Sequence, residues 1–313
     1  MKAAVVTSFD HPPRYTDIGE PVPEMPGEML VDVLAAGLHH ITRGRASGAH
    51  YSSTGRPPLV AGVDGVGRGT DGKLRYFVQA PDQLGTMADR TVIELRRSIE
   101  LPGDCDPVAL AAAMNPAMAS WLALRCRVPF QEVRNVLILG ATGSSGSMAV
   151  QVARHLGAVQ VIAAGRDEHK LARLRELGAT DTVTLGDARL GALASDVDVV
   201  LDFVWGELAV RIMETVIRQR KDRGAPFTWI HIGSMAGDMA PIPGALLRAA
   251  NIEIVGSGHG SVSDRAILGE LPALARQIAS GTFRIDAQGT PLSSVEQAWR
   301  TPAGTGARIV FTP

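Results

Sequence analysis

The hydrophobic and polar positions of this chain follow three successive patterns. The first third contains short apolar runs bounded by Pro and Gly, and these runs predict strands at Lys2–Ser8, Glu28–Ala36 and Val60–Arg68. Short strands with this turn punctuation are typical of a β-rich or barrel-like domain.

The second pattern starts near Leu110 and alternates strand-like with helix-like segments. Ser147–Leu156 has apolar residues on one helical face and stops at Gly157, and the next helical segment stops at Gly178. Six apolar runs predict strands: Asn135–Leu139, Gln160–Ala164, Asp181–Thr184, Val197–Val204, Thr228–Ile232 and Ile252–Gly256. Strands that alternate with helices form a parallel sheet, so this region predicts a doubly wound, Rossmann-type dinucleotide-binding domain.

A third pattern follows about Ser261. Ser293-Ser294-Val295-Glu296 has the spacing of a capping box for a short helix, and Arg308–Phe311 predicts a final strand that can pair only with the first domain. The predicted fold class is therefore α/β. Residues 1–113 and 263–313 form a β-rich domain around an inserted nucleotide domain of residues 114–262.

Composition narrows the classes of function. The 313 residues have a formal net charge of −1, so no basic field predicts nucleic acid or an anionic membrane as a partner. No uninterrupted apolar stretch of about 18 residues predicts a membrane span. The two cysteines, Cys105 and Cys126, are too far apart for a CxxC motif and are expected to be small buried side chains in a cytoplasmic protein.

The turn after the first Rossmann strand has the AxGxxG form of a nucleotide-binding loop. Gly143 would let the backbone approach a pyrophosphate, Gly146 would let the helix pack on the strand, and the helix N-terminus would meet the phosphate charge. The residues expected to contact the cofactor here are Ala141, Thr142, Gly143, Ser144, Ser145 and Gly146.

The end of the second Rossmann strand predicts which cofactor binds. NAD enzymes place an acidic residue about 20 residues after the loop, whereas this strand ends at Gly165-Arg166 and Lys170 follows one helical turn later. Two cations suit a 2′-phosphate, so the sequence predicts NADP(H), with Asp167 as a helix cap. The alternative is that both cations are solvated and that Asp167 binds the ribose.

Together these features resemble the zinc-free, zeta-crystallin-like quinone oxidoreductase branch of the medium-chain dehydrogenase/reductase superfamily. The resemblance covers nearly the whole chain and implies a GroES-like catalytic domain, with the active site in the cleft between the domains. Its motifs are Ala35-Ala36-Gly37, Ser47-Gly48, Ala61-Gly62-Val63-Asp64-Gly65-Val66-Gly67, Asn115-Pro116-Ala117-Met118-Ala119-Ser120-Trp121, the nucleotide loop, Ile232-Gly233-Ser234-Met235-Ala236-Gly237, Gly256-Ser257-Gly258, and Pro291-Leu292-Ser293 with Arg308-Ile309-Val310.

The resemblance also implies that catalytic zinc is absent. A catalytic zinc ion needs three protein ligands, and the ligand positions of zinc-bearing relatives fall on His39, Val63 and a position near Pro116. Without a Lewis acid, hydride transfer to a conjugated acceptor is favoured, because the developing charge spreads over an enolate or hydroquinone anion. The expected activity is NADPH-dependent reduction of a quinone, by one or two electrons, or of a similar conjugated carbonyl.

The resemblance assigns two further sets of residues. The catalytic candidates are Tyr51, His39, His40 and Ser120, the last at the start of a helix. The remaining cofactor candidates are Asn115, Phe203, Val204, Trp205, Ile232, Gly233, Ser234, Gly256, Ser257 and Gly258. The competing interpretations are structural histidines, a helix-capping serine and a core tryptophan. Acceptor specificity is expected to depend on loops 39–58 and 234–262.

Two other functions remain open. One is an enone, enal or enoyl-thioester reductase that uses the same hydride geometry, and the other is a nucleotide-binding sensor or RNA-binding protein with little catalysis. The aromatic content of 4% and the balanced charge disfavour RNA binding. The apolar strand Ile252–Gly256, preceded by Leu246 and Leu247, predicts a homodimer through a sheet edge.

Overall fold

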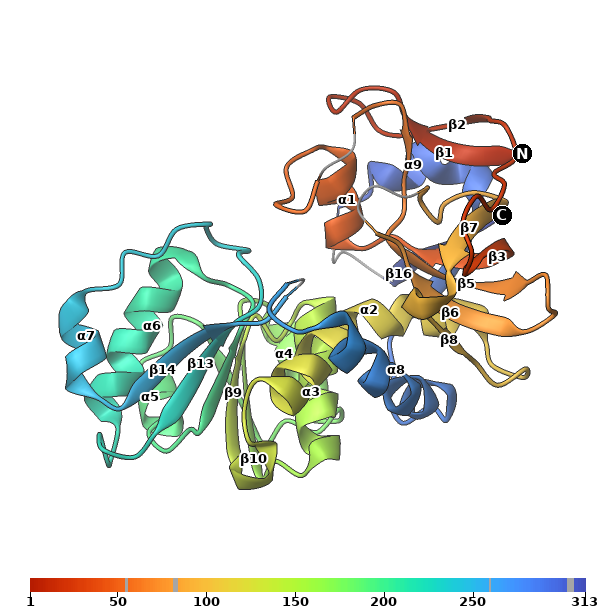
Figure 1. Ribbon diagram of the computed structural model, residues 1–313. Coiled ribbons are helices and arrows are strands. Elements are labelled where there is room, and N and C mark those ends of the chain that lie inside the picture. The colour runs from red at the N-terminus through yellow and green to blue at the C-terminus, as the bar shows by residue number, and fades with distance from the viewer. Residues whose placement is uncertain (54–55, 81–83, 259, 303–306) are drawn as a thin grey trace. The chain divides into compact units, whose positions relative to one another are not determined.

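The computed structural model describes residues 1–53, 56–80, 84–258, 260–302 and 307–313 (Figure 1). The chain divides into two compact units, which we call unit 1 (Met1–Asn115 with Asp264–Pro313) and unit 2 (Pro116–Ser263). The first boundary falls inside helix α2 (Pro107–Cys126). The expected boundaries were 113/114 and 262/263.

Unit 1 is built on two sheets. A three-stranded antiparallel sheet has the order β2-β1-β4, and a seven-stranded sheet has the order β15-β16-β3-β5-β6-β8, with β7 paired to β3, over the described residues. The strands are β1 (Lys2–Val6), β2 (Arg14–Asp17), β3 (Glu28–Gly37), β4 (Leu59–Val60), β5 (Asp64–Gly69), β6 (Leu74–Val78), β7 (Arg90–Glu94), β8 (Ser98–Glu100), β15 (Ala287–Pro291) and β16 (Arg308–Thr312). The α-helices other than α2 are α1 (His40–Ala46), α8 (Asp264–Ala279) and α9 (Val295–Trp299), and the 3-10 turns are η1 (Leu95–Arg97) and η3 (Leu292–Ser294).

The last strand joins the first segment of the chain. In β16, Val310 lies opposite Gly37 and Phe311 opposite Ala36, antiparallel to β3. Phe311 is fully buried with Phe77 in the core of unit 1. This pairing confirms the prediction that the closing strand completes the first domain.

Two predictions for unit 1 were wrong in detail. The apolar run Val60–Arg68 is two strands, β4 and β5, because Gly62 turns the chain at φ +114° and a Cβ there would lie 2.3 Å from Thr86 Oγ1. The short helix α9 forms, but neither Ser293 nor Ser294 caps it. The 3-10 turn η3 runs directly into α9, and Leu292 O in this turn accepts the N–H of Val295, the first residue of the helix.

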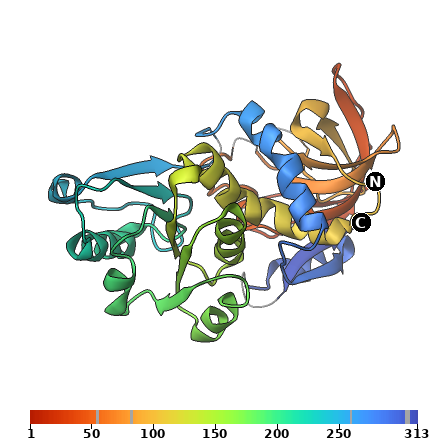
Figure 2. The ribbon, with the colours of Figure 1, turned by 90° about the horizontal axis from the view of Figure 1, so that it is seen from below.

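Unit 2 has the predicted doubly wound fold. Its six parallel strands have the order β11-β10-β9-β12-β13-β14. They are β9 (Asn135–Leu139), β10 (Gln160–Gly165), β11 (Asp181–Thr184), β12 (Val199–Asp202), β13 (Phe227–His231) and β14 (Ile252–Gly256). The helices are α3 (Ser144–Leu156), α4 (Glu168–Leu174), α5 (Arg189–Leu193), α6 (Gly206–Gln219) and α7 (Gly244–Ala249), and η2 spans Phe130–Glu132. Helices α3 and α4 lie on one side of the sheet and α5, α6 and α7 on the other (Figures 1 and 2).

The apolar periodicity of α3 explains its place against the sheet. Ala149, Val152 and Ala153 are fully buried, and the helix ends at Gly157 with φ +108°, as predicted. The next helix, α4, stops at Leu174, four residues before the predicted end at Gly178, because the chain enters hydrogen-bonded turns there.

One helix in the described part of the chain, α2, is long and apolar enough to cross a membrane by composition. The apolar segment is 72% buried within the protein, which is the pattern of a core helix. The two cysteines form no disulfide within the described residues and are half-buried rather than fully buried as expected. Cys105 lies in a turn before α2, and Cys126 is the last residue of that helix, so neither side chain is enclosed on all sides.

Candidate nucleotide and acceptor site

The turn after β9 is fixed by main-chain bonds to the neighbouring strand. The N–H groups of Gly140 and Ala141 both donate to Ala164 O at 2.9 Å, and Gly140 has φ +85°. A Cβ on Gly146 would lie 2.2 Å from Gly140 O, so only glycine lets α3 start this close to β9. The proposed role of Gly146 in helix–strand packing is therefore supported by geometry.

The N-terminus of α3 is open to an anion. Gly143 is its exposed N-cap, in extended backbone and without a side-chain cap, while Ser144 and Ser145 are half-buried. The first N–H groups of a helix have no carbonyl partner within it. These donors, together with the helix dipole, can bind a pyrophosphate.

The end of β10 presents cations next to this turn. Gly165 packs under Thr142, since a Cβ there would lie 2.4 Å from Thr142 Cγ2. Arg166 is exposed, with no hydrogen bond or ion pair to another described residue. Asp167 caps α4 by accepting from Lys170 N–H at 3.1 Å, and its carboxylate lies 3.9 Å from Lys170 Nζ. The predicted capping role of Asp167 is confirmed.

A buried aspartate organises the loop after β12. Asp202 Oδ1 accepts from the N–H groups of Val204 and Trp205 at 2.8 and 2.9 Å, and Oδ2 accepts from Trp229 Nε1 at 2.8 Å. Burial raises the pKa of Asp202 above its usual value, against these donors. Phe203 and Val204 are buried beside this carboxylate.

Trp205 adopts a backbone conformation that is rare for a large side chain. It has φ +54°, and its ring stacks on His231 with centroids 4.3 Å apart. Burial lowers the pKa of His231, and no described group hydrogen-bonds to its buried Nδ1. Trp205 therefore lies where β12 and β13 end, instead of in the centre of the core.

The predicted cofactor residues of unit 2 share one edge of the sheet. Because the strands are parallel, the segments that follow their carboxyl ends all lie at the same end of the sheet. The switch point between β9 and β12 opens at this end. The remaining members are Ile232, Gly233 and Ser234 after β13 and Gly256, Ser257 and Gly258 at the end of β14. Asn115, half-buried in α2, belongs to unit 1.

Unit 1 contains a buried array of ionisable side chains. His39 Nε2 lies 2.9 Å from Asp64 Oδ1, and Tyr76 donates to Asp64 Oδ2 at 2.7 Å. Arg308 Nη2 donates to His39 Nδ1. A guanidinium can only donate, so Nδ1 accepts and the ring hydrogen sits on Nε2, facing the carboxylate.

The pKa shifts of this array agree with a neutral histidine between opposite charges. Burial lowers the pKa of His39, and the charge of Arg308 adds to that, against Asp64. Burial also lowers the pKa of Arg308 to about 10 and raises that of Tyr76 well above its usual value. Gly37 allows the array, because a Cβ there would lie 2.4 Å from the His39 ring.

The four catalytic candidates lie in different environments. His39 is 1% exposed, with Asp64 facing Nε2 and Arg308 at Nδ1, whereas His40 is exposed at the first turn of α1 and Tyr51 is 73% exposed. The prediction that Ser120 starts a helix is wrong. It lies inside α2, fully buried, and donates to Ala117 O at 3.2 Å, because the apolar run that begins at Pro107 forms one continuous helix through it.

Sequence reasoning missed several residues. Arg308 was considered only as part of the closing strand, and Tyr76 was not considered at all. Arg308 lies 269 residues from its partner His39, and Trp229 lies 27 residues from its partner Asp202. An isolated acidic residue at the start or end of an apolar strand is the one feature that could have drawn attention to Asp202 and Asp64.

The zinc positions were predicted to be unsuitable. Val63 and Pro116 are both buried and offer no donor atom, and the described residues contain no cluster of three or more His, Cys, Asp or Glu that could hold a metal. His39 faces Asp64 on one side and Arg308 on the other. The positive charge of Arg308 therefore already balances the negative charge of Asp64.

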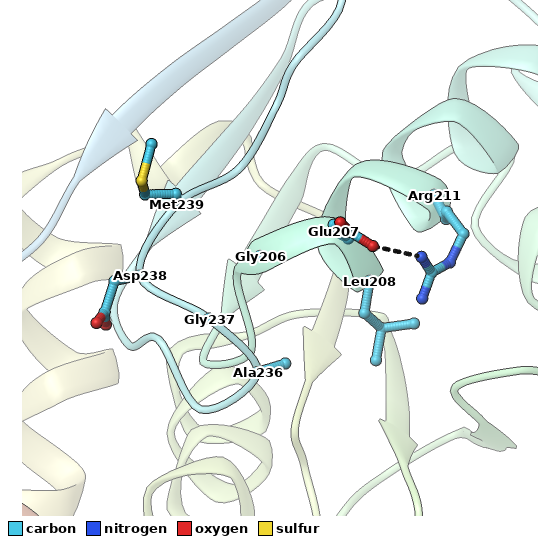
Figure 3. A pocket seen from close by; sticks show the side chains of 8 residues that line it. All are labelled: Gly206, Glu207, Leu208, Arg211, Ala236, Gly237, Asp238 and Met239. Atoms are coloured by element: carbon cyan, nitrogen blue, oxygen red, sulfur yellow. Dashed lines mark ion pairs between the residues drawn. The ribbon is translucent and has the colours of Figure 1, made fainter.

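A separate cavity of about 600 Å³ lies at the start of α6 (Figure 3). Helix α6 and the facing loop after β13 line it with Gly206, Glu207, Leu208, Arg211, Ala236, Gly237, Asp238 and Met239. Arg211 is paired with Glu207 at 3.6 Å, and Asp238 adds a second negative charge. The lining includes none of the predicted cofactor residues, and its charge does not suit a phosphate.

The doubly wound sheet with its glycine-containing turn and the β-rich unit with its closing strand define the class of dinucleotide-binding proteins with a second, GroES-like unit. Residues 146–271 match the family model described as zinc-binding dehydrogenase. This match covers less than half of the chain, and in that part the chain is similar to the medium-chain dehydrogenase/reductase superfamily.

Three known proteins illustrate the relationship. A probable NADPH-dependent quinone reductase from Emericella nidulans is 29% identical, with all of both chains covered. An NADPH-dependent alkenal/one oxidoreductase from Arabidopsis thaliana is 26% identical over 58% of this chain and 52% of its own. The solved quinone oxidoreductase of Thermus thermophilus is 26% identical with a TM-score of 0.81, with all of both chains covered.

Proposed function

We propose that this chain is an NADPH-dependent oxidoreductase that transfers hydride to a quinone or similar conjugated carbonyl. The observation that carries the proposal is the pairing of the Ala141–Gly146 turn at the N-terminus of α3 with Arg166 at the end of β10. The turn supplies main-chain donors for a pyrophosphate, and Arg166 supplies an uncommitted cation where a ribose-binding acid would stand in an NAD enzyme. The names of the relatives support this cofactor and acceptor class.

The residues present fit the cofactor. Residues 141–146 would hold the pyrophosphate, Arg166 and Lys170 the 2′-phosphate, and Trp205 with residues 232–234 the remainder along the same sheet edge. The bound cofactor would supply the hydride. The protein's own contribution is to orient the cofactor and to hold a hydrogen-bond donor, with Tyr51 and His40 as the exposed candidates, near the oxygen that becomes negative.

The proposed mechanism does not use zinc. Hydride transfer to a conjugated acceptor places the charge on a delocalised anion, which needs a donor and a dry pocket more than a Lewis acid. Val63 at one ligand position of zinc-bearing relatives, and Pro116 near another, support this.

The first experiment follows oxidation of NADPH and of NADH with 1,2-naphthoquinone, with and without EDTA. We expect turnover that prefers NADPH and does not respond to the chelator. In the variant Arg166→Met, loss of a charge-assisted contact should raise the KM for NADPH about 10- to 100-fold and leave the KM for NADH nearly unchanged.

The control for this variant is Arg175→Met, which removes an exposed cation of unit 2 whose described side-chain bond goes to Thr180 O. It should leave both KM values unchanged. Equal effects of Arg166→Met on both cofactors would contradict the 2′-phosphate assignment, and failure to bind either nucleotide would overturn the proposed function.

A second candidate is reduction of the carbon–carbon double bond of an enone or enal. The likeness to the alkenal/one oxidoreductase supports it, and the same cofactor geometry would serve. Reduction of 2-cyclohexenone at a higher kcat/KM than 1,2-naphthoquinone would favour this acceptor class.

We also propose that the chain acts as a homodimer in the cytoplasm. Strand β14 is an edge of the described six-stranded sheet, and the nearby Leu247 is 51% exposed. Sedimentation velocity at micromolar concentration should show a dimer, and Leu247→Glu should shift it toward monomer because the new charge would be buried in the contact. A monomeric wild-type protein would contradict this proposal.

A further inference from the structure

The half-buried guanidinium of Arg45, near the end of α1, has few partners. Its side chain makes one hydrogen bond to another described residue, from Nε to Ser52 Oγ at 3.0 Å. A guanidinium has five N–H donors, so most of those on Arg45 have no protein acceptor within the described part of the chain. Its terminal nitrogens are not among the fully buried unpaired atoms and are therefore open to a ligand.

The positive charge of Arg45 lacks a partner carboxylate. Burial lowers the pKa of Arg45, and the fields of Tyr51 and Asp64 act against that shift. Asp64 is itself occupied by Tyr76 at 2.7 Å and by His39 at 2.9 Å. Arg45 is therefore a half-buried cation without an ion pair to any described residue, and its Nη atoms are accessible to an anion.

A second cation strengthens the local positive field. The charge of Arg97 acts on Arg45 and lowers its pKa further. Arg97 is paired with Asp264 at 2.9 Å, so it does not need another anion. Of these two arginines, Arg45 is the one whose charge is available to a bound anion.

The segment after α1 fixes the direction in which Arg45 can bind. His50 Nδ1 lies 2.7 Å from Ser52 Oγ and accepts from Ser52 N–H at 3.1 Å. Since Nδ1 accepts both hydrogens, the Ser52 hydroxyl oxygen is left to accept from Arg45 Nε. That bond uses the Nε edge and leaves the edge formed by the two Nη atoms, which matches the two oxygens of a carboxylate or sulfonate.

An exposed phenol lies beside this group. The rings of Tyr51 and His50 are in contact, with centroids 4.3 Å apart, while Tyr51 remains 73% exposed. A phenol O–H next to a cation can add a second donor to a bound oxyanion.

We propose that Arg45 binds an anionic group of the acceptor, so that the substrate is a quinone or conjugated carbonyl bearing a carboxylate or similar oxyanion. This rests on the proposed function and specifies its substrate class. The Nη edge of Arg45 receives the oxyanion and Tyr51 supplies the neighbouring donor. A neutral acceptor leaves the Arg45 charge uncompensated and binds more weakly.

The test compares two acceptors that differ by one charge, 1,2-naphthoquinone-4-sulfonate and 1,2-naphthoquinone. In Arg45→Met, kcat/KM for the sulfonate should fall about 10- to 100-fold, because a charge-assisted contact is lost. For the neutral quinone it should change by less than about threefold, as for a surface substitution. Arg45→Lys, which keeps the charge and loses the fork, should lie between wild type and Arg45→Met.

The control is Arg68→Met, which removes an exposed cation of unit 1 bonded to Gly72 O at 2.9 Å. It should leave the ratio of the two kcat/KM values unchanged. An equal loss for both quinones in Arg45→Met would overturn the inference and assign Arg45 a structural role.

A binding measurement separates this inference from the proposed function. Naphthalene-1-sulfonate, which cannot be reduced by hydride, is titrated calorimetrically against wild type and Arg45→Met in the presence of NADPH. Weaker binding to the variant, with 1-naphthol unaffected, would support the anion site even if neither quinone were turned over. Identical binding to both proteins would reject the site whatever the activity.

Discussion

Replacing Gly146 with alanine is expected to destabilise unit 2 and to remove nucleotide binding together. A Cβ at this position would lie 2.2 Å from Gly140 O and 2.6 Å from Ala141 Cα, and both are backbone atoms that cannot move aside as a flexible side chain could. Helix α3 would have to shift away from β9, which costs about 1–3 kcal/mol for overpacking of this kind and more if main-chain bonds break. Urea unfolding and NADPH titration by fluorescence measure the two effects.

Gly143→Ala is the matched control. Gly143 has ordinary extended backbone, and the nearest atom to a Cβ there is Gly140 O at 3.4 Å, an ordinary contact. This variant should unfold within about 0.5 kcal/mol of wild type, as exposed substitutions do. NADPH should still bind it more weakly, because the methyl group occupies space that the pyrophosphate needs. A Gly146→Ala protein with wild-type stability and wild-type affinity would contradict the role given to this turn.

The elements of unit 2 could be predicted because each strand is a short apolar run between clear breaks. The predicted bounds of β11 and β14 agree with the structure to the residue, and the glycines that end α3 and follow α4 have left-handed φ values. The capping role of Asp167 was also predictable, since the residues involved are three apart. In each case the spacing of residues close together in the sequence was sufficient to predict the element or the cap.

Contacts between distant residues could not be predicted in the same way. The His39–Arg308 bond joins residues 269 apart, and the two lie together only because β16 pairs with β3. The left-handed backbone of Trp205 depends on two hydrogen bonds to Asp202 and on stacking against His231 from another strand. Ser120 was misplaced because its position was taken from the resemblance, whereas the local signal for the start of α2 is Asp106, which accepts from Val108 N–H at 2.9 Å before Pro107.

Replacing Asp64 with asparagine is expected to give the largest loss of stability in unit 1. The buried carboxylate accepts from Tyr76 at 2.7 Å, faces His39 Nε2 at 2.9 Å, and balances the charge of the half-buried Arg308. Removing one member of a buried charged array costs about 3–5 kcal/mol, because the opposite charge is left without compensation. Urea unfolding at pH 7 measures this. Asp32→Asn in β3, which removes an exposed partner of Arg90, should cost less than about 1 kcal/mol.

A double-mutant cycle tests whether Asp64 and Arg308 act as one unit. In Arg308→Met the carboxylate loses its balancing cation, so this single variant should also be destabilised. The combined variant removes both charges, and its loss of stability should be smaller than the sum of the two single losses by more than about 0.5 kcal/mol, the limit for independent sites. Additive losses would show that His39 does not connect the two charges. That outcome would favour a role for His39 in binding a ligand over a role in stabilising the fold.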